Sequence, residues 1–516
     1  MVITESSSVA EIVEAVPGAR AIFDKHGLHG CGGTHGPTEQ LSFFASVHQV
    51  DLKALLQELN EEAQRPQQPL VYQETLQDFI YRRFFKAGIA IVLSVGALWG
   101  AVNLAQIAIG KSFLQLRLVQ PIHAHAHAMI FGWVGLFVMG FAYQSFPRFK
   151  NTTLWRPDLA NLSFYLMVAG IIARMSAELL IETGPGLALG VFSGGVELIS
   201  ILLFLTLLYK TASKSIEPRN PYEKFLVASF LWFFVQALLS DCFFFAKLTA
   251  QGQEQLIRRI ALIDGSLRDI QLLGFAALII AGVSQRFVPV VYGLKRPKKD
   301  RQALIFALMN VALVLNVISY VAVLTTGNVA WGLGLEIAYL LMPVWAVLLA
   351  IQLGIFSKPT QPDRTFKFIR AAYVWLIIAN GMMPFFLLYG ILTHQWFAHA
   401  YMGAHRHAFT VGFISMMIMG VAARVVPILA GVDSRKLSAL WGPFLLITIG
   451  NCGRVLLQIG TDFFPNICYP LVGLTGFLEV AALTWWGVGL WRIMNRSHVE
   501  RAKVLATPVP QLVVLR

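Results

Sequence analysis

The stretch that decides the fold is QPIHAHAHAMIFGW, residues 120–133, in which three histidines at alternate positions open a long apolar run. A second stretch, GAHRHAFTVGF at residues 403–413, repeats this arrangement with His405 and His407. Ionisable side chains are costly in a bilayer and are retained there mostly for function. Five of the 12 histidines lie in these two stretches. The pattern therefore predicts a haem or metal site held between two membrane-spanning helices.

The composition is that of an all-α, polytopic membrane protein rather than a soluble enzyme. Hydrophobic residues make up 56% of the 516 residues and charged residues 13%, and the mean hydropathy is +0.63. An apolar run of about 20–25 residues is long enough to cross a hydrocarbon core of about 30 Å as a helix. We count twelve such runs, at 86–108, 123–146, 159–182, 187–210, 222–247, 267–291, 303–325, 330–356, 367–393, 405–430, 437–460 and 468–492.

Lysine and arginine are concentrated in alternate connections between these runs. With a cytoplasmic N-terminus, the outer connections hold few cations, namely Lys111, Arg117, Arg258, Arg259 and Arg268. The positive-inside rule then predicts a multi-pass membrane protein with both termini in the cytoplasm and with the histidines in the outer leaflet. This distribution accounts for the net charge of +13 without a nucleic-acid partner.

The chain divides into four segments. Residues 1–64 are expected to form a small soluble helical domain, because VAEIVEAV and DLKALLQELNEEA have helix-period apolar spacing on either side of the loop HGLHGCGGTHGP. Residues 65–85 are expected to be a linker, 86–495 the membrane domain and 496–516 a cytoplasmic tail. The first segment lacks the apolar core of a signal peptide. The four cysteines are scattered and indicate no disulfide framework.

The membrane domain contains an internal repeat. The two histidine stretches align without a gap, at one constant offset that places His125 on His405, and a weaker third copy lies between them. Matched positions in the three copies are Gly132, Gly412 and Gly274; Gly140, Gly420 and Gly282; and Pro147, Pro427 and Pro289. We therefore expect three pseudo-repeats of four helices. The alternative is chance similarity between apolar helices, in which Gly and Ala recur in any case.

The spacing of the histidines predicts that they lie on two opposite sides of each helix. Positions i and i+2 on a helix lie about 200° apart, so His405 and His407 point in opposite directions and one helix can serve two sites. Imidazole suits iron, copper and zinc, and haem iron takes axial histidine. We expect the haem ligands to be His125, His127, His405 and His407. The candidates for a second metal, copper or non-haem iron, are His123, His394 and His399. The alternative for any single histidine is interfacial packing.

Two arginines are candidates to neutralise haem propionates, which arginine can do bidentately. Arg174 and Arg454 are related by the same offset as the two histidine stretches and lie at the depth of the histidines. The alternative is an intramembrane salt bridge, for instance between Arg174 and Glu178. Each unit also carries one glutamate in its fourth helix: Glu197, Glu336 and Glu479. For these we favour interhelical hydrogen bonding over proton relay.

The two histidine blocks, HAHAMIFGW at 125–133 and HAFTVGFISMM at 407–417, resemble the NnrS family over residues 86–495. That resemblance implies a twelve-helix haem protein of the bacterial response to nitric oxide. The chain departs from the family pattern in one place, because residues 426–431 read VPILAG where the family has LGHTGR. A ligand or anion site carried by that family histidine is therefore not expected here.

The arrangement also resembles the catalytic subunit of haem–copper oxidases and nitric oxide reductases. In that superfamily the helix-10 pair serves two haems and helix 2 completes the bis-histidine one. A binuclear site there needs further histidines in helices 6 and 7, where this chain has Asp269 and Gln271 in helix 6 and no histidine in helix 7. The N-terminal segment is similar to the front domain of ScdA-type iron–sulfur-repair proteins, which suggests Cys31 and His35 as redox or metal residues against the alternative of a surface loop.

Three functions follow as hypotheses. The first is a haem protein, of the b type by expectation, that binds or turns over nitric oxide; turnover would make it an oxidoreductase with quinol or cytochrome c as electron donor. The second is a diverged nitric oxide reductase or terminal oxidase subunit with a second metal. The third is a haem-free transporter or sensor, which the parallel orientation of the repeats disfavours because transporter repeats are usually inverted.

Overall fold

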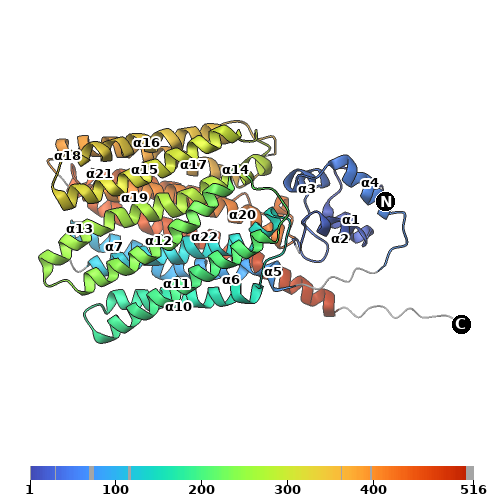
Figure 1. Cartoon of the computed structure of the whole chain (residues 1–516), viewed down its shortest axis with the longest axis horizontal. Helices are drawn as coiled ribbons and strands as arrows, with labels where there is room; N and C mark the ends of the chain where they lie inside the picture. The colour runs from blue at the N-terminus through green and yellow to red at the C-terminus, as the bar shows by residue number, and fades with distance from the viewer. Residues whose placement is uncertain are drawn as a thin grey trace.

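The computed structural model of the chain describes residues 2–29, 31–68, 75–113, 115, 118–361, 363–395 and 398–506, with side chains as far as 495. Arg117 of the outer connections, residues 69–74 of the expected linker and residues 507–516 of the expected tail lie outside these ranges. The described part of the chain is all-α and contains no strand. Long helices lie side by side in one bundle, and the small N-terminal domain sits at one end of it (Figure 1).

Twelve helices are long and apolar enough to cross a membrane, which confirms the predicted polytopic all-α class. In chain order they are α5–α7 (Leu76–Gly110), α8–α9 (Val119–Phe149), α10 (Pro157–Leu179), α11 (Gly184–Ser213), α12 (Glu223–Leu248), α13–α14 (Gln253–Tyr292), α15 (Lys299–Thr326), α16 (Trp331–Leu353), α17–α18 (Phe366–Thr393), α19–α20 (His399–Leu429), α21 (Trp441–Gly460) and α22 (Pro465–Ala506).

The first span begins earlier than expected. Its helix starts at Leu76, inside the expected linker 65–85, because Thr75 and Asp78 form a capping box there. Thr75 Oγ1 and the backbone N–H of Thr75 both donate to the Asp78 carboxylate, at 3.0 and 2.8 Å. A capping box satisfies backbone donors that the first turn would otherwise leave free. At the other end of the chain, α22 continues to Ala506, so the described start of the expected tail is helical.

The second, sixth and tenth spans share an unusual build that confirms the threefold repeat. Each changes from α-helix to an eight-residue π-helix and back: η3 (Ala128–Gly135), η4 (Ile270–Ala277) and η6 (Ala408–Ser415). Their first residues, Ala128, Ile270 and Ala408, occupy equivalent positions in the three copies of the sequence repeat. π-Helices are rare and occur often at functional sites. The middle copy, which sequence similarity supported only weakly, is therefore structurally equivalent to the other two.

These three spans form the centre of the bundle. The most apolar window of each is 78% buried, whereas the windows of the other nine spans are at most 50% buried. Where the central helices meet, a cavity of about 90 Å³ is lined by apolar side chains that include Phe137, Ile280, Phe287, Met417 and Val421. The axis of the bundle is thus an apolar core, around which the polar residues are arranged.

The N-terminal domain has four short helices and its own core. The helices are α1 (Val9–Ala15), α2 (Ala19–Lys25), α3 (Leu41–His48) and α4 (Leu52–Glu62), so the two predicted helices are present together with two that were not predicted. Val9, Phe23, Leu41 and Leu59 are fully buried between them.

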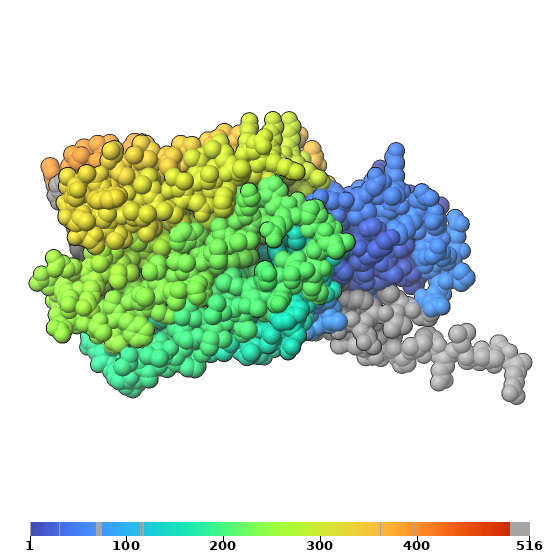
Figure 2. Space-filling view, viewed as in Figure 1, coloured from blue at the N-terminus to red at the C-terminus, as the bar shows by residue number. Residues whose placement is uncertain are grey.

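This domain packs against the end of the bundle (Figure 2). Arg148 of the second span donates to the carbonyl of His29, and Arg424 of the tenth span pairs with Glu39 at 2.9 Å. The domain therefore rests on the ends of two of the three central helices.

Candidate functional site

His125 and His407 belong to one site. His125 lies in α8 (Val119–His127) and His407 ends α19 (His399–His407), and the two rings are close enough to each other and to Arg454 to interact electrostatically. The Nδ1 of His125 is 2.9 Å from the carbonyl oxygen of Gly96, and the Nδ1 of His407 is 2.9 Å from that of Gly403. Nδ1–H donation to these carbonyls leaves each Nε2 as an acceptor. Within the described ranges no hydrogen bond engages either Nε2.

Two glycines of the first span bring His125 into position. The imidazole lies against Gly100 of α7 (Ala97–Gly110), where an added Cβ would stand 2.5 Å from Cε1 of His125 and 2.9 Å from its Nδ1. One turn earlier, Gly96 supplies the carbonyl that binds Nδ1, and a Cβ there would stand 2.9 Å from the Sδ of Met129. Only glycine at these positions allows this close approach between the first and second spans.

Arg454 in α21 completes this site with unsatisfied donors. Its side chain is buried, yet its Nε and Nη1 have no hydrogen-bond partner among the described residues. The same is true of Oε1 of Glu479 in α22 and of both side-chain polar atoms of Asn451. Gly450 brings α21 close to α22, since a Cβ there would lie 2.9 Å from Cγ of Glu479. Buried polar groups without a partner cost about 1–3 kcal/mol each, so their clustering indicates a further group in this site.

The residues at this site fit a haem. Histidine that ligates a metal usually donates its other ring N–H to a carbonyl or carboxylate, which fixes the tautomer and ring orientation, and both His125 and His407 are held in this manner. The free N–H groups of Arg454 suit a propionate carboxylate. Eight residues farther along the second and tenth spans, Trp133 donates to Ser415 at 3.1 Å and packs edge-on against Trp486.

His123 and His127 point to the other side of the second span. The Nε2 of His127 is 2.8 Å from Oε1 of Glu197 in α11, and its ring stacks on Phe131. The Nδ1 of His123 is 3.2 Å from the Nζ of Lys247 in α12. His127, predicted as a haem ligand, is therefore separated from His125 and has its Nε2 occupied by a carboxylate.

Around these two histidines lies a group of buried and half-buried ion pairs, which we call the charge cluster. It consists of the pairs Arg174–Asp241, Lys247–Glu178, Arg268–Asp264 and Arg406–Asp264 together with the His127–Glu197 pair. The salt-bridge alternative for Arg174 is thus what the structure shows, although its partner is Asp241 and not Glu178. Nε and Nη1 of Arg174 still have no partner in the described part of the chain. The guanidinium lies 4.7 Å from the ring centroid of Phe244.

Sequence reasoning missed most of the charge cluster. Asp241, Lys247 and Asp264 were not singled out, although each lies within or beside an apolar run. An ionisable residue inside a spanning segment is itself a signal for a functional or paired position. The glutamates differ from one another as well: Glu197 and Glu479 are buried, whereas Glu336 is only half-buried.

The remaining candidate ligands are not gathered into one place. His405 is 7% exposed and its Nδ1 has no partner within the described residues. His399 begins α19, and His394 ends α18 (Phe386–Thr393) in a left-handed conformation with φ 54°. No three His, Cys, Asp or Glu side chains of the described ranges are disposed to hold a metal ion. A second metal at His123, His394 and His399 stays a prediction.

In the N-terminal domain, Cys31 and His35 have different environments. His35 is exposed, whereas Cys31 packs against both the core of its own domain and that of the bundle. Burial raises the pKa of the Cys31 thiol, which opposes formation of the reactive thiolate. Burial and the nearby Arg148 lower the pKa of His29.

Comparison with known proteins places the membrane domain and leaves the N-terminal domain unassigned. No curated protein matches the chain. The family model described as "NnrS protein" matches residues 77–497, which is most of the chain and includes both histidine motifs. The match stops short of the N-terminal domain, so the likeness of that domain to ScdA-type proteins stays a prediction, as does the haem–copper-oxidase likeness. A match of this extent shows that the chain belongs to the NnrS family.

Proposed function

We propose that this protein binds a haem between His125 and His407 and acts in the bacterial response to nitric oxide. One observation carries the proposal: two imidazoles from different central helices each have Nδ1 bonded to a backbone carbonyl and Nε2 free, beside an arginine with two unpartnered N–H groups. The NnrS family and its association with nitric oxide supply the choice of gas. The strong Lys and Arg bias supports an inner-membrane location with the N-terminal domain in the cytoplasm.

The residues of the site have separate tasks. His125 and His407 would hold the haem iron through their Nε2 atoms, and the carbonyls of Gly96 and Gly403 fix the orientation of the two rings. The unpartnered N–H groups of Arg454 would bind a propionate carboxylate. A bound haem would supply one-electron redox chemistry, and its iron would be open to a diatomic gas only where one of the two histidines is released. A b-type haem, held only by such non-covalent contacts and axial bonds, is the form these residues fit.

The charge cluster gives the opposite side of the second span a different role. The contact of 2.8 Å between His127 and Glu197 can hold a proton at either Nε2 or the carboxylate, in a position with little access to water. His405, whose Nδ1 has no partner among the described residues, comes from the same helix as His407 and supplies a candidate ligand for a second group. We therefore assign proton or gas handling to this side and haem binding to the His125–His407 side.

The second candidate is a haem–copper-type nitric oxide reductase or oxidase subunit. The observation that favours it is that histidines of the second and tenth spans lie in one site. In the sixth span, however, Asp269 accepts from Asn316 at 2.7 Å and Gln271 donates to Gln236 at 3.0 Å. Asp269 and Gln271 thus have hydrogen-bond partners within the protein, and they stand in the helix where such a metal site uses histidine. A redox-active second metal found by elemental analysis, together with nitric oxide consumption driven by quinol or cytochrome c, would favour this candidate.

The experiment is to purify the protein from cells supplied with haem precursor and to record optical spectra before and after reduction and exposure to nitric oxide. We expect about one haem for each intact His125–His407 site, since metal-site affinity follows the ligand set, and a spectral change with the gas. Protein that folds but takes up no haem, in cells and by titration, would refute the proposal. The haem-free transporter or sensor would then be the remaining candidate.

A further inference from the structure

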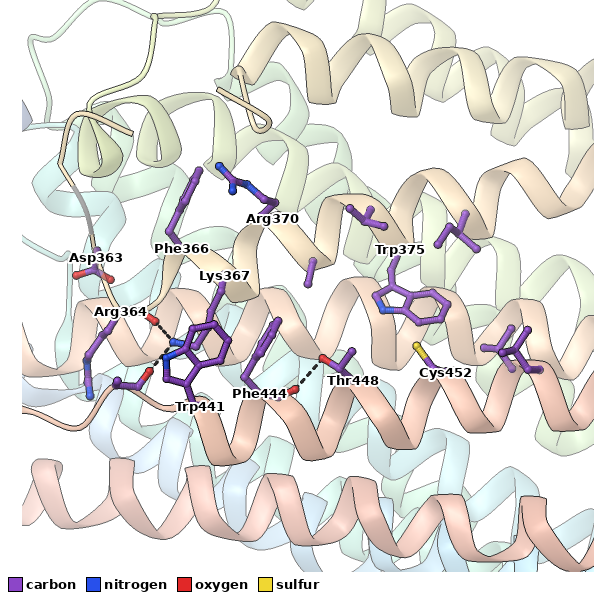
Figure 3. A pocket seen from close by; sticks show the side chains of 16 residues that line it. Asp363, Arg364, Phe366, Lys367, Arg370, Trp375, Trp441, Phe444, Thr448 and Cys452 are labelled. Carbon is purple, nitrogen blue, oxygen red and sulfur yellow. Dashed lines mark hydrogen bonds between the residues drawn. The ribbon is translucent and has the colours of Figure 1, made fainter. Parts of the chain in front are cut away.

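A lipid-facing groove lies between the ninth and eleventh spans, away from the histidines. It has a volume of about 1030 Å³ and is bounded by α17 (Phe366–Met382) on one side and α21 on the other. Figure 3 shows its length, with Arg364 and Lys367 at one end and Trp375 and Cys452 farther along. The groove thus has a charged end and an apolar body.

The apolar body opens to the surface that the bilayer covers. Ile378 is 41% exposed and Leu456 70% exposed, on opposite walls. Both walls pack on the tenth span, since a Cβ at Gly412 would stand near both Trp375 and Asn451. A groove of this kind is wide enough for an acyl chain, whose burial against protein resembles its burial in the bilayer.

The charged end carries three cations and one carboxylate, Asp363, so positive charge is in excess there. Arg364, Lys367 and Arg370 make no ion pair with any described residue, and the neighbouring Asp363 is paired with Arg424 at 3.5 Å. Instead the three cations donate to backbone carbonyls. The partners are Ser438 and Ala423 for Arg364, the carbonyls of Arg364 and Ala439 for Lys367, and Ile355 and Ser357 for Arg370. A positive charge remains uncompensated at this end.

The position of these cations in the bilayer is that of a headgroup. They lie just before or within the first two turns of α17, at the end of the bundle that carries the N-terminal domain. Lys367 lies 4.7 Å from the ring centroid of Trp441, which is 57% exposed. Tryptophan and snorkelling lysine mark the membrane–water interface. Basic pockets between spans on the cytoplasmic side bind anionic headgroups.

We propose that this groove is a binding site for an anionic phospholipid, with its phosphate at Arg364, Lys367 and Arg370 and an acyl chain along Trp375 and Cys452. Charge complementarity selects this occupant. A zwitterionic lipid would leave the excess positive charge in place, and a neutral quinone would use only the apolar body. The inference does not depend on haem or on nitric oxide.

The test compares two variants that lose the same charge. In one, Arg364, Lys367 and Arg370 are replaced by Gln; in the control, Lys295, Arg296 and Lys298 of the connection between the sixth and seventh spans are replaced by Gln. Each full-length protein is exchanged into phosphatidylglycerol or phosphatidylcholine, and retained lipids are counted by native mass spectrometry. We expect the groove variant to bind phosphatidylglycerol about a hundredfold more weakly, because each basic side chain at the surface contributes about 1 kcal/mol. The control is expected to bind as the unaltered protein does.

A labelling measurement on the unaltered groove keeps the test decisive if the groove variant fails to fold. Cys452 becomes the single cysteine when Cys31, Cys242 and Cys468 are replaced by Ser, and it is labelled with a membrane-soluble maleimide. Phosphatidylglycerol is expected to slow this labelling, whereas phosphatidylcholine, free glycerol phosphate and a quinone analogue are not. A matched protein that retains only Cys242, exposed on α12, is expected to show no lipid dependence. Equal protection by phosphatidylcholine, or protection by the quinone alone, would overturn the proposal.

Discussion

Replacing Gly100 by alanine should dislodge His125 without unfolding the bundle. The added Cβ would stand 2.5 Å from Cε1 of His125, 2.9 Å from Nδ1 and 3.0 Å from Nε2. Carbon atoms in contact prefer about 3.5–4.0 Å, so the ring must move by about 1 Å. That shift opposes the 2.9 Å hydrogen bond from Nδ1 to Gly96. Loss of such an orienting bond typically lowers metal affinity about 10–100-fold.

The assay is a haem titration of the purified apo-protein, followed by absorbance and by the low-spin signal of a bis-histidine haem. Alanine stabilises a helix by about 1 kcal/mol relative to glycine. The change in backbone propensity should therefore not lower the thermal stability of the Gly100→Ala protein without haem. Gly489→Ala is the matched control, because a Cβ at Gly489 of α22 meets no atom within 4 Å. Unchanged haem affinity and an unchanged spectrum in Gly100→Ala would refute the placement of His125 at the site.

Three further predictions concern other parts of the molecule. Arg454→Gln should keep the bis-histidine spectrum but weaken haem binding by about 1.5–3 kcal/mol, the value of hydrogen bonds from a charged group, as measured by haem transfer to an apo-acceptor. Glu197→Gln should leave haem content unchanged and alter the pH dependence of any nitric oxide reaction, because the His127 contact lies on the other side of the span; a stopped-flow pH profile checks this. Burial, with Arg286 and Arg148 nearby, lowers the pKa of His48 to about 3. As the pH falls, His48 therefore takes up a proton in the unfolded chain at a higher pH than in the folded chain. The free energy of unfolding of the N-terminal domain should then decrease between about pH 6.5 and about pH 3, by up to about 2 kcal/mol at pH 5. Denaturant unfolding of full-length protein and His48→Asn at pH 7 and pH 5 tests this, since the variant should lose the pH dependence.

The repeat could be predicted from sequence because helix packing requires the same residue types at equivalent positions of the three copies. Central helices that meet along an apolar axis need glycine at close contacts and tolerate proline near their ends, so Gly132 and Pro147 have counterparts at the equivalent positions of the other two copies. The three eight-residue π-helices, which begin at equivalent positions as well, confirm the units. Their presence was not predicted, because a π-helix depends on the packing of the whole span and leaves no distinct residue pattern.

The pairing within the site was beyond sequence reasoning for a different reason. A spacing of i and i+2 shows that His125 and His127 face opposite sides, but it does not say which of them faces His407. In the structure the His125 ring lies near His407 and against Gly100, whereas His127 pairs with Glu197 on the other side of the span. The partners in the charge cluster are likewise far apart along the chain, as in Arg174–Asp241, so their pairing appears only in the folded protein.

The central claim is that one histidine from each of two central helices, His125 and His407, forms the haem site. The most direct measurement is the low-spin haem signal in electron paramagnetic resonance of His125→Ala, His407→Ala and His127→Ala, each reconstituted with haem under the same conditions. We expect the first two variants to lose the bis-histidine signal and His127→Ala to retain it. Loss of the signal in His127→Ala with retention in His125→Ala would contradict this assignment.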